Sequence, residues 1–246
     1  TKMANTRAKP NLPVNYEEQL AKEAAEIAKR IAAPTGDRIR FNANRAFITP
    51  DGMEGETLEV VIVDFVSSNL FYDGPFDRDN PQPPGCFAIG PEPSLLVPSP
   101  NSPNKQAETC TSCPNNQFGS ALTGKGKACK NTEVLFILRP GNMLPLALRV
   151  PPTSLGVVKK YLLQLTSASI PFYGVTTRLS LEKATNAAGI GYSKLVLAPV
   201  AFDASASEAR ARLMLPSDTV ADIKAYRDAL LPQLQAAVAV IESEAE

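Results

Sequence analysis

The sequence predicts a mainly β protein with helices at both ends, an α+β fold. Between residues 38 and 203, segments rich in β-branched and aromatic residues alternate with clusters of proline and glycine. The two ends instead show alanine and apolar residues at helical spacing. We therefore expect three parts: an N-terminal arm and helix over 1–36, a β domain over 37–203, and a helical extension with an acidic end over 204–246.

The first 36 residues predict a short amphipathic helix. Thr1 to Pro13 is polar and basic, and Asn15 is a suitable N-cap with Glu18 at the third helical position. The helix ends at the Ala33-Pro34-Thr35-Gly36 run. Its apolar face is formed by Leu20, Ala24, Ile27 and Ile31. We expect this face to pack on the body of the protein.

The segment 57–66 is the strongest predicted strand, and its strand character continues through Phe71 and Tyr72. A helix is expected to begin at Thr153 or Ser154, with a buried face formed by Leu155, Val158, Leu162 and Leu165. Residues 38–47 alternate loosely. Further strands are predicted over 86–89, 132–138, 144–150, 172–181 and 192–202.

This order of elements matches a five-stranded OB-fold barrel, which carries a helix between its third and fourth strands. An SH3-like barrel or a general α+β sheet would give a similar pattern, so these alternatives remain open. A long insertion, about residues 73–131, interrupts the domain. It contains a run from Pro91 to Gln106 with five prolines, which predicts a loop.

Four cysteines lie in or beside this insertion, at Cys86, Cys110, Cys113 and Cys129. Cys110 and Cys113 form a C-x-x-C turn, and the chain contains no histidine. A metal site here must therefore use thiolates alone, which predicts a structural Zn²⁺ ion held by all four. Free or catalytic thiols and disulfides are the alternatives.

The formal net charge is zero, but the charge is unevenly distributed. From Lys105 to Arg139 there are five basic and two acidic residues, whereas the last six residues carry three acidic ones. Local basic side chains and exposed rings are what single-stranded nucleic acid requires. We expect Lys125, Lys127, Lys130 and Arg139 to contact phosphates, and Phe71 and Tyr72 to stack on bases.

Several classes of function are disfavoured. Without histidine the usual general base is missing. The run Gly119 to Lys125 is not a P-loop, because Gly126 stands where a hydroxyl residue is needed. The acidic residues Asp73, Asp77 and Asp79 suggest a nuclease but have no partner carboxylate on a strand or helix. We therefore predict that the protein is not an enzyme.

Two further observations concern location. No run approaches the roughly 18 apolar residues that cross a membrane. The opening segment also lacks the apolar stretch of a signal peptide. We expect an intracellular protein that does not bind membranes.

The run Cys110-x-x-Cys113-Pro-Asn-Asn-Gln-Phe-Gly-Ser120, followed by Gly124-Lys-Gly-Lys-Ala-Cys129-Lys-Asn131, resembles a segment of the single-stranded DNA-binding proteins of tailed bacteriophages. The Pro-Thr-Ser-Leu155 and Tyr-Gly-Val-Thr-Thr177 runs are also similar to that group. The resemblance covers about residues 57–185. In that family a zinc-bearing insertion decorates an OB-like barrel.

The resemblance implies non-specific binding to single-stranded DNA during phage replication or recombination, in the host cytoplasm. It also implies that the acidic C-terminus contacts replication or recombination proteins. The alternative is a zinc-stapled structural or adaptor protein that docks onto a polymerase or virion component.

Overall fold

The computed structural model describes residues 38–41, 45–75, 80, 82–122, 125–140, 142, 144–185, 189 and 191–243, with the backbone alone for 231–243. The predicted N-terminal helix with its Asn15 cap, the residues Asp77 and Asp79, and the side chains of the acidic C-terminal end lie outside the described residues. Within the described part, no helix is long and apolar enough to span a bilayer.

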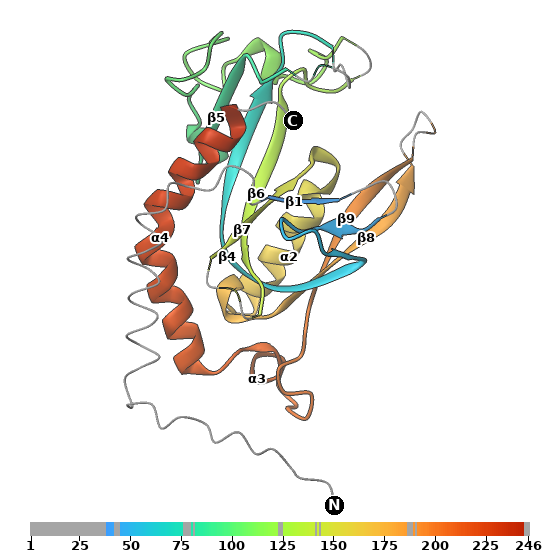
Figure 1. Ribbon diagram of the computed structural model, residues 1–246, viewed down its shortest axis with the longest axis vertical. Helices are drawn as coiled ribbons and strands as arrows, with labels where there is room; N and C mark the ends of the chain where they lie inside the picture. Colours follow the sequence, from blue (N-terminus) through green and yellow to red (C-terminus); the bar gives the residue numbers. More distant parts are fainter. Residues whose placement is uncertain are drawn as a thin grey trace, which may run out of the picture.

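The described chain is mainly β, as predicted, with a few helices (Figure 1). The strands are β1 (Arg38–Phe41), β2 (Phe47–Ile48), β3 (Glu54–Gly55), β4 (Thr57–Phe71), β5 (Cys86–Gly90), β6 (Lys130–Leu138), β7 (Leu146–Val150), β8 (Thr177–Thr185) and β9 (Gly191–Pro199). The helices are α2 (Leu155–Ser167), α3 (Ala209–Leu213) and α4 (Ser217–Ser243). Four 3₁₀ turns are η1 (Pro93–Leu95), η2 (Pro114–Asn116), η3 (Pro152–Ser154) and η4 (Phe172–Gly174).

The long strand β4 organises the sheet. It pairs antiparallel with β6 along one side. On its other side it pairs with β8 over Thr57 to Val60 and with β5 over Ser67 to Phe71. A register shift between Ile62 and Asp64 marks a β-bulge, which bends the strand. The strands follow the order β3-β2-β1-β7-β6-β4-β8-β9, with β5 attached to β4.

The sheet curls into a half-barrel around α2 (Figure 1). Its concave face holds the main core, where Val60, Ile62 and Leu135 pack against Val158 and Leu165 of α2. Tyr161 also faces this core, and its hydroxyl lies 2.7 Å from that of Thr177. Because helical spacing brings residues 158, 161 and 165 to one face, α2 closes the concave side, as the apolar pattern predicts.

The start of α2 differs in detail from the prediction. Ser154 is the N-cap residue, but its hydroxyl makes no capping hydrogen bond. Instead, the Ser154 hydroxyl accepts a hydrogen bond of 3.0 Å from the backbone N–H of Leu195 in β9. Ser154 therefore connects the start of α2 to β9, the last strand in the sheet order.

Helix α4 crosses the convex face of the sheet and contacts β4 and β5 (Figure 1). Beneath it lies a second apolar cluster that includes Val63, Val66, Val134 and Phe136, with Ile223 of α4 packed against it. Apolar packing of this kind is the main source of stability for such a helix.

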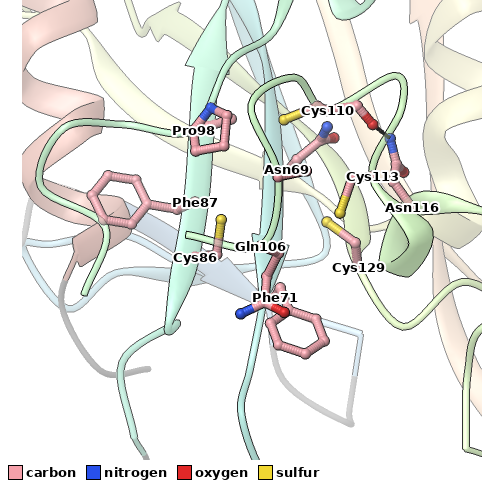
Figure 2. Close-up of a pocket in the computed structure, with 12 residues that line it drawn as sticks. Asn69, Phe71, Cys86, Phe87, Pro98, Gln106, Cys110, Cys113, Asn116 and Cys129 are labelled. Carbon is pink, nitrogen blue, oxygen red and sulfur yellow. Dashed lines mark hydrogen bonds between the residues drawn. The ribbon is translucent and has the colours of Figure 1, made fainter. Parts of the chain in front are cut away.

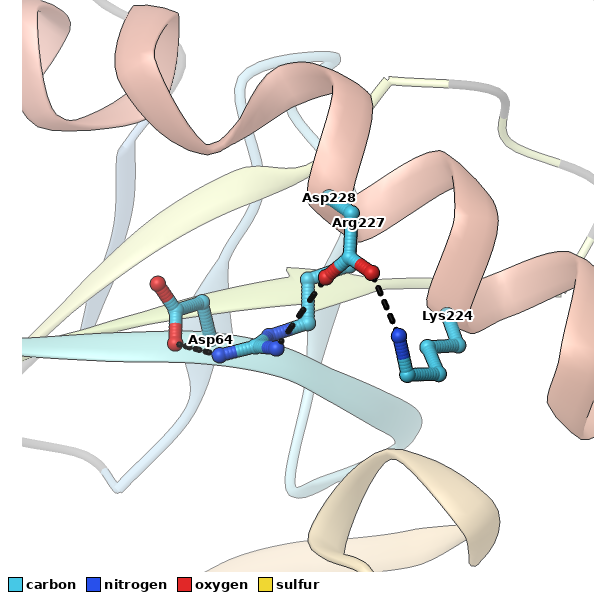
Figure 3. A network of polar contacts seen from close by, with 4 residues as sticks. All are labelled: Asp64, Lys224, Arg227 and Asp228. Carbon is cyan, nitrogen blue, oxygen red and sulfur yellow. Dashed lines mark hydrogen bonds and ion pairs between the residues drawn. The ribbon is translucent and has the colours of Figure 1, made fainter.

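A polar contact adds to this packing. Arg227 of α4 donates to the Asp64 carboxylate at 3.2 Å, and the Asp64 side chain is only 9% exposed. The Arg227 guanidinium also lies 5.8 Å from the ring centres of Phe172 and Tyr173 in η4. On the exposed side of the helix, Lys224 pairs with Asp228 at 2.6 Å (Figure 3).

Three predicted strands are too long: 144–150 and 192–202 extend beyond β7 and β9 by a few residues, and 172–181 differs more. Residues 172–181 were expected to form a strand, but Phe172 to Gly174 form the turn η4 and β8 begins at Thr177. Phe172 instead packs edge-on against Phe65 of β4, with ring centres 5.4 Å apart. Its aromatic character therefore reflects burial beside β4 and not membership of a strand.

Candidate nucleic-acid interface and thiol cavity

The chain between β5 and β6, residues 91–129, forms a long loop that we call the cysteine loop. Its start is held to β5 by Ser102, whose hydroxyl accepts from the Phe87 N–H at 3.0 Å and donates to the Phe87 carbonyl at 2.9 Å. The Cys110 N–H donates to the Leu96 carbonyl at 2.9 Å. Leu96, Ala88 and Cys110 form a small apolar cluster below these contacts.

Side-chain amides fix the second half of the cysteine loop. Asn131 of β6 donates to the side-chain oxygens of Asn69, at 2.5 Å, and Asn116, at 2.9 Å. The Asn116 amide donates to the Cys110 carbonyl at 2.7 Å. Gln117 donates to the carbonyls of Thr111 and Cys113. This network explains how a loop with a small apolar cluster keeps one conformation.

The four cysteines line one small cavity of about 10 Å³ between β4, β5 and the cysteine loop (Figure 2). All four are buried and none forms a disulfide. Asn69, Phe71 and Asn116 contribute to the same lining.

Two thiols of this cavity, those of Cys110 and Cys129, have raised pKa values. Burial and, to a smaller extent, the charges of the neighbouring thiols raise the pKa of Cys129 to about 12. Burial also raises the pKa of Cys110, although a hydrogen bond with the Asn69 side chain opposes this shift. Neutral buried thiols pack as small apolar groups.

The prediction of a four-thiolate zinc site is wrong for this structure. Among the described residues there is no group of three or more cysteine, aspartate or glutamate side chains placed to hold a metal ion. Hydrogen bonds and apolar contacts order the loop in place of the expected Zn²⁺ ion.

The described residues 118–122 and 125–127 of the cysteine loop form a turn that we call the finger. The Gly119 N–H donates to the carbonyls of Lys125, at 3.2 Å, and Gly126, at 2.9 Å, which closes the finger into a tight turn. Gly119 has φ of +88°, a conformation that favours glycine. The finger exposes two large apolar side chains, Phe118 at 84% and Leu122 at 96%.

Lysines accompany the exposed ring of the finger. The Lys127 ammonium lies 5.1 Å from the centre of the Phe118 ring. It also donates to the Asn116 side chain at 3.2 Å, so it is anchored to the amide network. Lys125 is exposed within the finger and Lys130 is exposed at its base, where β6 begins. The finger therefore presents positive charge around an apolar tip.

Phe71 and Tyr72 lie at the end of β4, where the preceding residue Leu70 pairs with Lys130. Phe71 is half-buried and lines the thiol cavity (Figure 2). Tyr72 is also half-buried. Arg139 lies at the other end of β6 and pairs with Asp51 at 3.0 Å, and its side chain is only 15% exposed.

The predicted nucleic-acid contacts do not include two exposed residues of the finger, Phe118 and Leu122. The signal that could identify them is local: both stand in a glycine- and lysine-rich segment without apolar residues at strand or helix spacing. Such residues have no neighbouring apolar face to join, so they remain exposed to solvent.

One buried acidic group lies apart from these sites. Glu133 of β6 is 5% exposed, and its Oε2 atom has no hydrogen-bond partner among the residues that the structure describes. Burial raises its pKa, while the positive charge of Lys159 on α2 partly offsets the effect.

No protein-family model, no curated protein and no solved structure matches this chain.

Proposed function

We propose that the protein binds single-stranded DNA without strict sequence preference and that the finger makes the principal contact. The observation that carries this proposal is the Phe118 ring, which is 84% exposed and has the Lys127 ammonium 5.1 Å from its centre. A ring next to a cation suits a nucleotide, because the base stacks on the ring while the amine meets the phosphate.

The surrounding charges support this assignment. Lys125 and Lys130 extend the positive surface on either side of Lys127. On the convex side of the sheet, α4 covers the apolar cluster that includes Val134 and Phe136. The concave side is filled by the main core and α2. The exposed side chains of the finger remain accessible to single-stranded DNA.

The topology also supports an OB-type barrel that is open at one seam. Five strands lie in the order β7-β6-β4-β8-β9, and α2 connects β7 to β8. In chain order this is third, second, first, fourth and fifth, with the helix between third and fourth. An OB-fold uses the loop between its first two strands to bind oligonucleotides. Here that connection runs from β4 to β6 and carries β5 and the finger.

In this proposal the protein is a binding protein and not an enzyme. It coats single strands in DNA replication or recombination of the phage type, which the resemblance over residues 110–131 suggests. The acidic C-terminal end would contact partner proteins.

The proposal is tested by fluorescence polarisation with a labelled oligo-dT. Phe118→Ala should weaken binding about tenfold, since one stacked base contributes about 1–3 kcal/mol. Phe202→Ala removes another exposed ring, 57% exposed and distant in sequence, and should leave the affinity unchanged. Replacing Lys125 and Lys130 by Gln should lower the slope of log K against log salt by about 0.7 per lysine.

Two results would overturn the proposal. One is the absence of binding by the wild-type protein at low salt, about 50 mM, where phosphate contacts are strongest. The other is an equal loss of affinity in the Phe118 and Phe202 variants, because a finger contact predicts a loss in the first alone.

A further inference from the structure

Beside the finger lies an open groove of about 370 Å³ that the predicted contacts do not use. Val97 and Pro98 form one side, and the run 105–108 forms the other. The size falls near the lower end of sites for small molecules, about 300–1,000 Å³. It suits one nucleotide and is too small for a folded partner.

The groove is directly connected to the base of the finger. The Gln106 side-chain oxygen accepts from the Asn115 amide at 2.9 Å. The Asn115 carbonyl in turn accepts from the Ser120 hydroxyl within the finger at 2.9 Å. Single-stranded DNA bound on Phe118 would therefore place its next nucleotides at this groove. Pro98 and Gln106 also line the thiol cavity, which backs the groove (Figure 2).

The polar groups of the groove differ in what they can offer to a ligand. The Gln106 amide already donates to the Asn104 carbonyl at 2.9 Å, so both ends of this side chain are used. Within the described part of the chain, no ion pair engages Lys105 or Glu108, and both side chains are exposed. The groove therefore offers one ammonium donor, one carboxylate acceptor and an apolar wall.

We propose that this groove is a nucleotide subsite that favours bases carrying an amino group. The inference rests on the proposed binding of single-stranded DNA. Lys105 contacts the phosphate, Val97 and Pro98 contact the base, and the Glu108 carboxylate accepts from an exocyclic amine. Cytosine, adenine and guanine have such a donor, and a carboxylate is a known acceptor for cytosine N4. Thymine has none, so it loses this contact.

The test compares oligo-dC with oligo-dT of equal length, both at about pH 7.5, for the wild-type protein and for variants. We expect about threefold tighter binding of oligo-dC, which lies at the lower end of the net contribution of one hydrogen bond because the Glu108 carboxylate is exposed. Glu108→Gln should reduce this ratio to about one. Glu182→Gln, a change of an exposed acidic residue on β8, should preserve the ratio.

A second variant tests the phosphate contact. Lys105→Ala should weaken both oligonucleotides equally and reduce the salt slope by about 0.7, as one lost phosphate contact predicts. Lys160→Ala, which removes an exposed lysine on α2, is the matched control.

The outcomes separate this inference from the proposed function. If oligo-dT and oligo-dC both bind, but the ratio is one in the wild type or is unchanged by Glu108→Gln, the subsite is refuted and single-strand binding stands. If the wild-type protein binds neither oligonucleotide at low salt, the proposed function fails and the subsite fails with it.

Discussion

The contact between Arg227 and Asp64 gives the sharpest prediction for stability. Arg227→Ala should destabilise the packing of α4 on the sheet. The substitution leaves the Asp64 carboxylate, which is 9% exposed, without its cation. It also removes the two contacts of the guanidinium with Phe172 and Tyr173.

The magnitude follows from burial. Breaking a fully buried ion pair costs about 3–5 kcal/mol. Arg227 is 24% exposed, so we reduce this cost to about 2 kcal/mol. The two ring contacts add about 0.5 kcal/mol each. The total of about 3 kcal/mol corresponds to a fall in Tm of about 6–12 °C for a chain of this length.

A double-mutant cycle identifies the cause. Asp64→Asn combined with Arg227→Ala leaves no buried unpaired charge, so the double variant should be more stable than Arg227→Ala alone. Urea unfolding followed by circular dichroism measures the free energies of unfolding of the wild type, Asp64→Asn, Arg227→Ala and the double variant. Lys224→Ala is the control, because the Lys224–Asp228 pair is exposed, and it should cause no measurable change.

Unfolding of Arg227→Ala at the same urea concentration as Lys224→Ala would refute the predicted cost of the unpaired Asp64 carboxylate. A double variant that is less stable than Arg227→Ala would refute it as well, because removal of the carboxylate charge would then bring no gain.

Three further predictions concern two buried side chains and the amide network of the cysteine loop. Because burial raises the pKa of Glu133, the folded protein holds this proton more tightly than the unfolded chain does. Stability should therefore fall as the pH rises from the ordinary value of 4.5 through the raised pKa. Glu133→Gln should remove that fall and gain about 1 kcal/mol near pH 8 in urea unfolding; an unchanged pH profile would contradict this. Iodoacetamide should react with Cys129 far more slowly in the native protein than in urea, and equal rates by mass spectrometry would disprove its burial. Asn116→Ala should accelerate trypsin cleavage in the finger while Gln82→Ala does not, and a resistant finger would show that the amide network is dispensable.

Much of the fold was accessible from local sequence patterns. The β-branched run that begins at Thr57 predicted β4, and apolar spacing from Leu155 to Leu165 predicted α2, because both patterns reflect burial on one face. The four cysteines line one cavity, but they do not form the metal site that their spacing predicted. Spacing along the chain does not determine how the folded loop orients its side chains.

The features that were missed depend on residues far apart in the chain. Arg139 was assigned to phosphate binding, yet Asp51, 88 positions away, pairs with it. Arg227 and Asp64 are 163 positions apart. Local periodicity contains no information on such pairs, since they arise only when the sheet and α4 have been brought together. Phe118 was missed for a different reason. It is exposed, whereas sequence periodicity identifies residues that share a buried face.

The hydrogen bond from the Leu195 amide to Ser154 has a consequence for the behaviour of the protein in concentrated solution. Strand β9 stands at the end of the sheet order, and the edge of a sheet can template the addition of strands from other molecules. The Leu195 N–H, near the middle of this edge, donates to the Ser154 hydroxyl at 3.0 Å. Because this donor is already used, it cannot pair with a strand of another molecule, which disfavours edge-to-edge association at this position.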